Sequence, residues 1–314
     1  MRGKMRDGFS REIEYLRFSI TERCNFFCRY CRTRDVCACD TDAGELTKQD
    51  VFRIISAFKK LGIKKLRLTG GEPFLRNDVF DIIDFAYDLG IQNINVTTNG
   101  FLHDDCIQRI IESSLSGVNI SLDTLDRQKY RELTGVDGLD VVVNAIQTLS
   151  RFKRVKLNAV LLKTINFDEV EDLILFAKDN NAVIRFIELM PIGVANRIFE
   201  REFVSTQDVL KKFKDFQRID DREKSVAEYY YIKDFDSVVG FINAISDHFC
   251  SRCNKVRVSS KGILYNCLFD EDGLDLKEHL SSEDVLAERI KQFVMKKKFA
   301  RSATTNSMMF KIGG

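Results

Sequence analysis

Short strand-like runs alternate with longer helical segments from about residue 15 to residue 190, and this rhythm restricts the chain to few folds. Strands that alternate with helices are typical of repeated βα units and a parallel sheet. The six predicted strands cover residues 15–21, 65–69, 94–98, 118–123, 155–160 and 183–189. Two of the helices between them are predicted at residues 51–61 and 79–89. Six such units predict an α/β fold, a partial (βα)6 TIM-like barrel.

The predicted strands have one apolar face and one polar face. Successive side chains of a strand point to opposite sides, so Leu16 and Phe18 share one face while Arg17 and Ser19 share the other. Helices on the outside would cover the apolar face, which predicts an interior lined by charged and hydroxyl groups. An ordinary barrel fills its centre with Val, Ile and Leu instead. An antiparallel sheet with one wet face would also alternate, but the intervening helices argue against it.

The βα rhythm ends near residue 190. Beyond it the sequence predicts a strand at 227–232, a hairpin at 255–267 that turns at Lys261 and Gly262, and a helix at 282–297. We therefore expect an N-terminal segment (1–14), a barrel (15–190) and a C-terminal extension (191–314). With 314 residues and 44% hydrophobic content, the chain can bury a core of this size.

Charge and cysteine content bear on partners and compartment. Lys and Arg total 49 against 47 Asp and Glu, a formal charge of +2, so we expect no nucleic acid and no membrane as partner. Residues 1–14 lack the apolar core of a signal peptide, and no apolar run approaches the length that spans a bilayer. A cytoplasmic location is predicted. In a reducing compartment, nine cysteines favour metal or redox chemistry over disulfides.

Cys24, Cys28 and Cys31 form a C-x3-C-x2-C group directly after the first predicted strand. Three thiolates on one loop can hold three irons of a 4Fe-4S cluster and leave the fourth iron open for a ligand. Zinc is the alternative. A closed zinc site takes four ligands, however, and Cys37 and Cys39 do not complete a familiar zinc-ribbon spacing.

Cys250, Cys253 and Cys267 form a second group, C-x2-C-x13-C, in the predicted extension. Three ligands again suit an iron-sulfur cluster with an open iron, which could bind a nitrogen or oxygen of a substrate. A zinc knuckle completed by His248 is the alternative on spacing alone. The presence of the first group favours a second cluster.

The cysteine spacing after the first strand resembles the radical S-adenosylmethionine (SAM) superfamily. A second match, Gly70, Gly71, Glu72 and Pro73, follows the second strand, and glycine there lets a ligand approach the backbone closely. The resemblance implies that SAM binds the open iron and that an electron from the cluster releases a 5′-deoxyadenosyl radical. Such a radical abstracts nearby hydrogen atoms, so it needs an interior that excludes water and fixes the substrate.

Over nearly its whole length the chain also resembles the GTP 3′,8-cyclase family of molybdenum cofactor biosynthesis. The matching segments are LRFSITERCNFFCRYC, LRLTGGEP, VTTNG, VNISLDTLD, VKLNAV, RFIELMPIG, FCSRCNKVRV with YNCLF, and the final IGG. This resemblance implies a lyase that converts GTP to (8S)-3′,8-cyclo-7,8-dihydroguanosine 5′-triphosphate with SAM and two 4Fe-4S clusters. It also implies an electron donor and a cyclic pyranopterin monophosphate synthase acting downstream, and it is compatible with a homodimer.

The resemblance to the cyclase family assigns roles to individual residues. For GTP it implies contacts from Arg17, Arg67, Thr97, Lys156, Lys255 and Arg257. For SAM it implies contacts from Tyr30, Gly71, Glu72, Ser121 and Met190. Arg17 and the terminal Gly313 and Gly314 are implied to be catalytic. Strand phase independently places Arg17, Arg67, Thr97 and Ser121 on the polar face, where a triphosphate would find cations.

Three features depart from the family pattern, and three alternatives stay open. Lys255 replaces the usual arginine, which keeps the charge but loses bidentate contact with phosphate. Cys37 and Cys39 are additional cysteines, and Ser307 stands where the tail usually has an arginine. The alternatives are a radical enzyme for another nucleotide, a radical enzyme that modifies peptides, and a zinc-stabilised binding protein, which would lack the brown colour of iron-sulfur clusters.

Overall fold

A computed structural model of the chain describes residues 4–32, 44–219, 226–301, 304–305 and 308–312. Within these ranges twelve strands form one sheet, in the order β12-β11-β10-β1-β2-β3-β4-β5-β6-β9-β8-β7. Its parallel centre consists of β1 (Tyr15–Ser19), β2 (Lys65–Thr69), β3 (Asn93–Thr98), β4 (Gly117–Ser121), β5 (Val155–Leu161) and β6 (Val183–Glu188). The six predicted strands are confirmed, each end within two residues of its predicted position.

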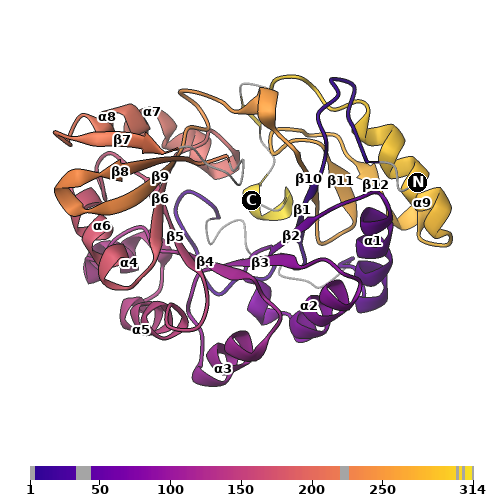
Figure 1. Ribbon diagram of the computed structural model, residues 1–314, viewed down its shortest axis with the longest axis horizontal. Helices are drawn as coiled ribbons and strands as arrows, with labels where there is room; N and C mark the ends of the chain where they lie inside the picture. Colours follow the sequence, from indigo (N-terminus) through magenta and orange to yellow (C-terminus); the bar gives the residue numbers. More distant parts are fainter. Residues whose placement is uncertain (1–3, 33–43, 220–225, 302–303, 306–307, 313–314) are drawn as a thin grey trace.

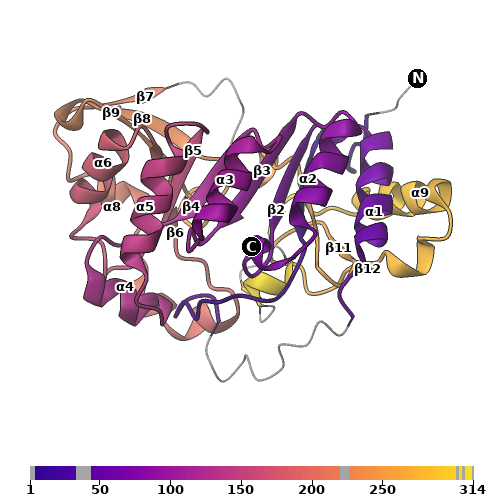
Figure 2. The ribbon, with the colours of Figure 1, turned by 90° about the horizontal axis from the view of Figure 1, so that it is seen from below.

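Helices cover the outer side of the six parallel strands, which curve around a common centre (Figure 1). They are α1 (Lys48–Lys60), α2 (Val79–Asp88), α3 (Asp104–Glu112), α4 (Arg127–Thr134), α5 (Leu139–Leu149) and α6 (Val170–Asp179). Seen from below, the helices again lie outside the strands (Figure 2). The predicted α/β fold with a partial (βα)6 barrel is confirmed.

The two faces of the parallel strands differ as predicted. Phe18, Leu66 and Leu68 are fully buried in the hydrophobic core between sheet and helices. Arg17 and Arg67 point the other way and line an interior cavity. Burial of a Leu or Phe side chain stabilises the fold by roughly 1.5–3 kcal/mol. Because a slip of one residue would exchange the two faces, this burial fixes which side chains face the interior.

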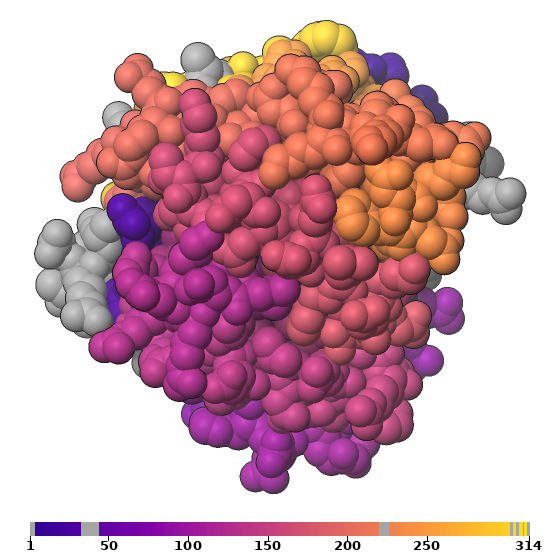
Figure 3. Space-filling model, turned by 90° about the vertical axis from the view of Figure 1, so that its left-hand side faces the viewer, coloured from indigo at the N-terminus to yellow at the C-terminus, as the bar shows by residue number. Residues whose placement is uncertain are grey.

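The C-terminal extension adds strands to both edges of the barrel sheet. β9 (Ser237–Ile242) pairs in parallel with β6, and β8 (Glu228–Ile232) and β7 (Phe216–Ile219) follow it in antiparallel order. At the other edge β10 (Lys255–Val258) pairs in parallel with β1, and β11 (Ile263–Tyr265) and β12 (Leu274–Asp275) follow it. In Figure 3 the orange residues of the extension and the magenta residues of the barrel form one continuous surface.

The elements predicted beyond residue 190 are present in the extension. The predicted strand is β8, the predicted hairpin is β10–β11 with Gly262 at a φ of 85°, and the predicted helix is α9 (Glu283–Val294), which lies beside α1. The short helices α7 (Phe199–Glu202) and α8 (Thr206–Leu210) follow β6. The pairing of β9 and β10 with the barrel was not predicted, and the division of the chain at residue 190 stays a prediction. None of the helices in the described ranges has the length and apolar character that a bilayer crossing requires.

Arg11 ties the N-terminal segment to the loop that carries Cys250. Its Nε lies 2.5 Å from Oδ2 of Asp7, and the two side chains are only 9% and 0% exposed. Nη1 donates to the backbone carbonyl of Cys250 at 2.5 Å, and Nη2 donates to the carbonyl of Lys298 at 2.7 Å. One side chain therefore connects three segments that are distant in sequence.

Replacing Arg11 by alanine is expected to lower the free energy of unfolding by about 3–5 kcal/mol, because the Asp7 carboxylate would stay buried without its cation. Arg6→Ala is the matched control. Arg6 pairs with Glu12 at 3.2 Å, but its side chain is 56% exposed, and such pairs contribute about 0–1 kcal/mol. Urea unfolding of both variants measures the difference. Equal losses would contradict a special role for Arg11.

Candidate functional site

The interior of the partial barrel encloses a cavity of about 620 Å³. Each of the six parallel strands contributes lining residues, and the extension contributes more. A cavity of this size lies in the range of about 300–1,000 Å³ that small-molecule and cofactor sites occupy. The polar strand face, predicted to form the interior, therefore forms the wall of a binding site.

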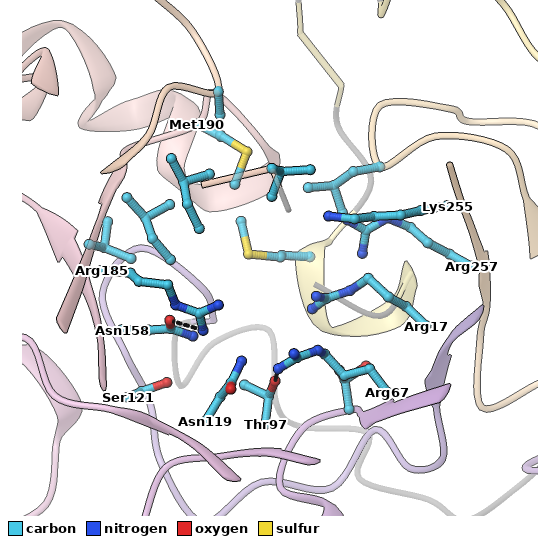
Figure 4. A pocket seen from close by; sticks show the side chains of 18 of the residues that line it. Arg17, Arg67, Thr97, Asn119, Ser121, Asn158, Arg185, Met190, Lys255 and Arg257 are labelled. Carbon is cyan, nitrogen blue, oxygen red and sulfur yellow. Dashed lines mark hydrogen bonds between the residues drawn. The ribbon is translucent and has the colours of Figure 1, made fainter. Parts of the chain in front are cut away.

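Positive charge gathers on one side of this cavity (Figure 4). Arg17 on β1 pairs in register with Arg67 on β2 and with Arg257 on β10, and Lys255 begins β10. Nη1 of Arg67 donates to Oγ1 of Thr97 at 3.2 Å. Burial and the neighbouring Arg257 lower the pKa of Arg17. Buried like charges are costly unless an anion joins them, so this group is suited to an anionic ligand.

The opposite wall of the cavity carries two further cations. Nη2 of Arg185, on β6, donates to Oδ1 of Asn158 at 2.5 Å (Figure 4). Nζ of Lys156, on β5, lies 3.3 Å from the hydroxyl of Tyr229. Burial and the charge of Arg67 lower the pKa of Arg185. All six residues implied to contact GTP line the cavity, so the structure brings them together from five strands.

Tyr15 lies buried among the cations at the start of β1. Its hydroxyl accepts a hydrogen bond from Nε of Arg67 at 2.5 Å. The ammonium groups of Lys65 and Lys255 lie 5.1 and 5.2 Å from its ring centre. Burial alone would raise the pKa of Tyr15, but the surrounding Arg and Lys charges lower it to about 6. At neutral pH a phenolate therefore offsets part of the positive charge.

The ionised Tyr15 is expected to give cluster-free protein a tyrosinate absorbance that appears near pH 6, far below the ordinary pKa of 10.0. Because the folded-state pKa is the lower one, this ionisation stabilises the fold fully above about pH 10, and the contribution is lost as the pH falls through about 6. Tyr15→Phe should remove this absorbance step. Tyr87→Phe, which changes an exposed tyrosine, should leave it. If tyrosinate absorbance in the parent protein first appeared above about pH 9, the lowered pKa of Tyr15 would be contradicted.

Cys24, Cys28 and Cys31 lie on the loop after β1, and all three line the cavity. The loop is fixed by backbone hydrogen bonds from Phe27 to the carbonyl of Thr134 at 2.8 Å and from Arg29 to that of Leu133 at 3.0 Å. Burial raises the pKa of Cys24 to about 11 and that of Cys28 well above its usual value. Burial therefore disfavours the thiolate forms of Cys24 and Cys28, which a bound metal would stabilise.

Gly70 and Gly71 let the segment after β2 lie directly against the first cysteine loop. A Cβ atom at Gly71 would lie 2.0 Å from the carbonyl oxygen of Arg23, and one at Gly70 would lie 2.4 Å from that of Thr21. The backbone N–H of Gly71 donates to the carbonyl of Thr21 at 2.8 Å. No larger residue fits at either position without moving this loop.

Glu72 is the one predicted SAM contact that does not line the cavity; Tyr30, Gly71, Ser121 and Met190 do. The Glu72 carboxylate is buried and accepts hydrogen bonds from Oγ1 of Thr98 at 2.9 Å and from the backbone N–H of Asn99 at 2.7 Å. Its side chain holds the end of β3, where the donors that a buried carboxylate needs lie, and its contact with SAM stays a prediction.

Cys250, Cys253 and Cys267 line the same cavity as the first cysteine group. Cys250 begins the 3-10 helix η5 (Cys250–Arg252), and Cys267 follows β11. Burial raises the pKa of Cys253, but the charges of Lys297, Lys255 and Arg257 outweigh burial and lower it. A basic environment of this kind favours thiolate ligands.

The donor set of each cysteine group suits a cluster. Among the described residues, no three His, Cys, Asp or Glu side chains converge closely enough to hold a single metal ion between them. In an iron-sulfur cluster each thiolate binds its own iron, so the sulfurs need not converge on one point. Each group places three thiols on the cavity wall, which is the donor set of a cluster that leaves one iron without a protein ligand.

The last described residues also reach the cavity. The 3-10 helix η7 (Met309–Ile312) lies inside the ring of strands (Figure 1), and Met309 lines the cavity. Ile312 is buried against Ile192 and Leu268. Five residues singled out in the sequence lie outside the described ranges: Cys37, Cys39, Ser307, Gly313 and Gly314.

Many lining residues were not among the predicted contacts, and three of them are polar residues with clear roles in the wall: Arg185, Tyr15 and Asp123. Arg185 and Tyr15 could have been found by strand phase, since each occupies an inward position of a predicted strand. Asp123 had the same signal, since it ends the predicted strand at 118–123 on the polar face that it shares with Ser121. Its carboxylate accepts a hydrogen bond from the hydroxyl of Tyr30 at 2.6 Å and another from the backbone N–H of Val160 at 2.7 Å.

Two family models match the chain. Residues 18–177 match the Radical SAM superfamily, and residues 182–304 match Molybdenum Cofactor Synthesis C. The GTP 3′,8-cyclase of Clostridium acetobutylicum is 36% identical over 319 residues, which cover 99% of this chain and 100% of that protein. The GTP 3′,8-cyclase of Alkaliphilus oremlandii is 38% identical over 295 residues, 91% of this chain and 92% of that protein.

Solved structures with the same fold include Streptococcus suis SuiB bound to S-adenosylmethionine. The alignment has a TM-score of 0.67 at 18% identity and covers 92% of this chain and 72% of the SuiB chain. SuiB bound to its precursor peptide SuiA gives the same TM-score at 16% identity. This likeness supports the fold, and the sequence relatives define the family. The chain belongs to the GTP 3′,8-cyclase family of the radical SAM superfamily.

Proposed function

We propose that this chain is a GTP 3′,8-cyclase, a lyase that converts GTP to (8S)-3′,8-cyclo-7,8-dihydroguanosine 5′-triphosphate at the start of molybdenum cofactor biosynthesis. Relatives with this name align with it over their full length. The observation that carries the proposal is one cavity that brings together two three-cysteine groups and a cluster of cations. A nucleoside triphosphate has the size and the charge that such a cavity can hold.

Radical SAM enzymes use SAM and a 4Fe-4S cluster, and Cys24, Cys28 and Cys31 are the residues that would hold this cluster here. Bound together, cofactor and cluster supply a 5′-deoxyadenosyl radical, which removes a hydrogen atom from the substrate. Tyr30 and Gly71 are proposed to contact SAM from the cysteine loop and from the segment after β2.

Two other SAM contacts are proposed from the barrel strands. Ser121 ends β4, and Met190 follows β6. Both line the cavity, on the side away from the four clustered cations (Figure 4). SAM and GTP would thereby occupy different parts of one water-excluding interior, which a radical reaction requires.

The cations of the cavity wall are proposed to bind and orient the GTP triphosphate. They are Arg17, Arg67, Lys156, Lys255 and Arg257, and the hydroxyl of Thr97 is proposed to contact GTP with them. Guanidinium groups donate two parallel hydrogen bonds to phosphate oxygens, so the three arginines fix orientation as well as charge. Arg17 lies between Arg67 and Arg257 in the sheet, and this central place supports its proposed role beside the reacting nucleotide.

A second 4Fe-4S cluster is proposed on Cys250, Cys253 and Cys267, with its open iron toward the substrate. The lowered pKa of Cys253 and the position of all three thiols on the cavity wall support it. The catalytic role of Gly313 and Gly314, the electron donor, a homodimer, the downstream synthase and the cytoplasmic location stay predictions.

An anaerobic reaction of reconstituted, reduced protein with SAM and GTP tests the proposed function. Mass spectrometry follows 5′-deoxyadenosine and the fate of GTP. Deoxyadenosine together with an isomer of GTP is the expected result. Deoxyadenosine with intact GTP would keep the radical chemistry but reject GTP as substrate. Neither product in a colourless protein would favour the zinc alternative.

A further inference from the structure

Lys297 is a buried lysine that the proposed reaction leaves without a role. It follows α9 in a run of three lysines, and its side chain is only 4% exposed, whereas Lys296 and Lys298 on either side are exposed. A buried ammonium group is costly unless hydrogen bonds and an anion compensate it. Its partners therefore indicate what this position is for.

A hydrogen bond holds the ammonium group of Lys297 beside the loop that carries Cys267. Nζ donates to the backbone carbonyl of Asn266, the residue before Cys267. Asn266 in turn donates from Nδ2 to the carbonyl of Phe293 at 2.9 Å, which joins the last turn of α9 to the same loop. The backbone N–H of Lys297 donates to the carbonyl of Val294 at 3.0 Å. Lys297 is therefore fixed at both its backbone and its ammonium group.

The carbonyl that accepts from Lys297 belongs to the peptide bond between Asn266 and Cys267, so the ammonium group lies beside the second cysteine group. The charges of Lys255 and Arg257 also act on this group, at Cys253. Those two residues line the cavity and face the proposed GTP site, whereas Lys297 does not line it. Lys297 can thus compensate negative charge on the cysteine group even when a triphosphate occupies the other cations.

We propose that Lys297 is the fixed counter-charge of the second iron-sulfur cluster, which it stabilises and whose reduction potential it raises. This inference rests on the proposed second cluster. Reduction adds one electron, taken from a low-potential donor, and makes the cluster more negative by one charge. A buried cation nearby favours that more negative form, because Coulomb attraction is stronger away from water. Net charge and hydrogen bonding around the sulfurs are known determinants of cluster potentials.

A redox titration of the second cluster tests the proposal. The full-length chain in which Cys24, Cys28 and Cys31 are replaced by serine retains only the second cysteine group for cluster binding. Dithionite and mediators set the potential, and electron paramagnetic resonance measures the reduced fraction. In Lys297→Met the ratio of oxidised to reduced cluster, at the midpoint of the parent, is expected to rise about tenfold, which corresponds to about 59 mV for one electron.

Matched variants separate charge from packing. Lys296→Met and Lys298→Met remove exposed charges of the same run and should leave the potential unchanged, and Lys297→Arg should keep it near that of the parent. An unchanged potential in Lys297→Met would overturn the proposal. If Lys297→Met does not retain iron, Lys297→Arg decides: iron retention supports the counter-charge, and equal loss in both variants refutes it. A folded parent chain that binds no iron at all would instead reject the second cluster, and with it this inference.

Discussion

Replacing Cys24 by alanine is expected to abolish the formation of 5′-deoxyadenosine from SAM. The first cysteine group supplies three ligands, and with two of them the cluster loses its attachment to the cavity wall. Loss of an outer-shell partner of a metal already costs about 10–100-fold, so loss of a ligand should cost more than about 100-fold. Anaerobic assay of deoxyadenosine and measurement of bound iron check the result.

Cys106→Ser is the matched control for the cysteine variants. Cys106 is a free, half-buried cysteine on α3 that does not line the cavity. This variant should keep its iron, and its rate of deoxyadenosine formation should stay within about twofold of the parent, as expected for a substitution away from the site. Deoxyadenosine formed by Cys24→Ala at the rate of Cys106→Ser would exclude the first group from the chemistry.

The second large effect is expected from Cys267→Ala, which should separate SAM cleavage from formation of the cyclised nucleotide. The first cysteine group stays intact, so deoxyadenosine should still form, within about tenfold of the parent rate. The cyclised nucleotide should fall by more than about 100-fold, because the proposed second cluster would lose one of three ligands. Bound iron should decrease by about four atoms per chain.

Mass spectrometry of one anaerobic reaction measures both products of Cys267→Ala. A parallel fall of deoxyadenosine and cyclised nucleotide would mean that Cys267 supports the whole fold and not a separate step. An unchanged yield of cyclised nucleotide would remove the second group from the mechanism. Cys106→Ser again shows whether loss of any cysteine has either effect.

The barrel could be predicted from the sequence because apolar residues recur in its strands and in its helices with the period that each kind of element has. Alternation in residues such as Leu16 and Arg17 shows which face is buried, and strand phase alone placed Arg17, Arg67, Thr97 and Ser121 at the cavity. The pairing of β10 with β1 could not be predicted in this way. Periodicity reports which side of a strand is apolar, but it does not report which distant strand supplies the backbone partners.

The same limit explains which site residues were predicted. Arg185 lies between the buried Ile184 and Phe186, so strand phase indicates an inward position for it as it does for Arg17, although the family resemblance assigned it no role. The carboxylate of Glu72 binds the backbone N–H of Asn99, a contact that exists only once β2 and β3 are side by side. Lys297 resembles its two neighbours in sequence, and only the packing of α9 against the loop of Asn266 sets it apart.

The pairing of β1 with β10 affects when the sheet can be completed during synthesis of the chain. Tyr15–Ser19 is made long before its partner Lys255–Val258, because most of the barrel and part of the extension lie between them in sequence. Until then one edge of β1 offers unpaired N–H and C=O groups, a state that natural sheets avoid because other chains can pair with it. A ribosome adds only about 5–20 residues per second, so β1 and the first cysteine loop that follows it exist without β10 for many seconds. The cavity wall that includes Lys255 and Arg257 of β10 is therefore completed only after most of the chain has been made.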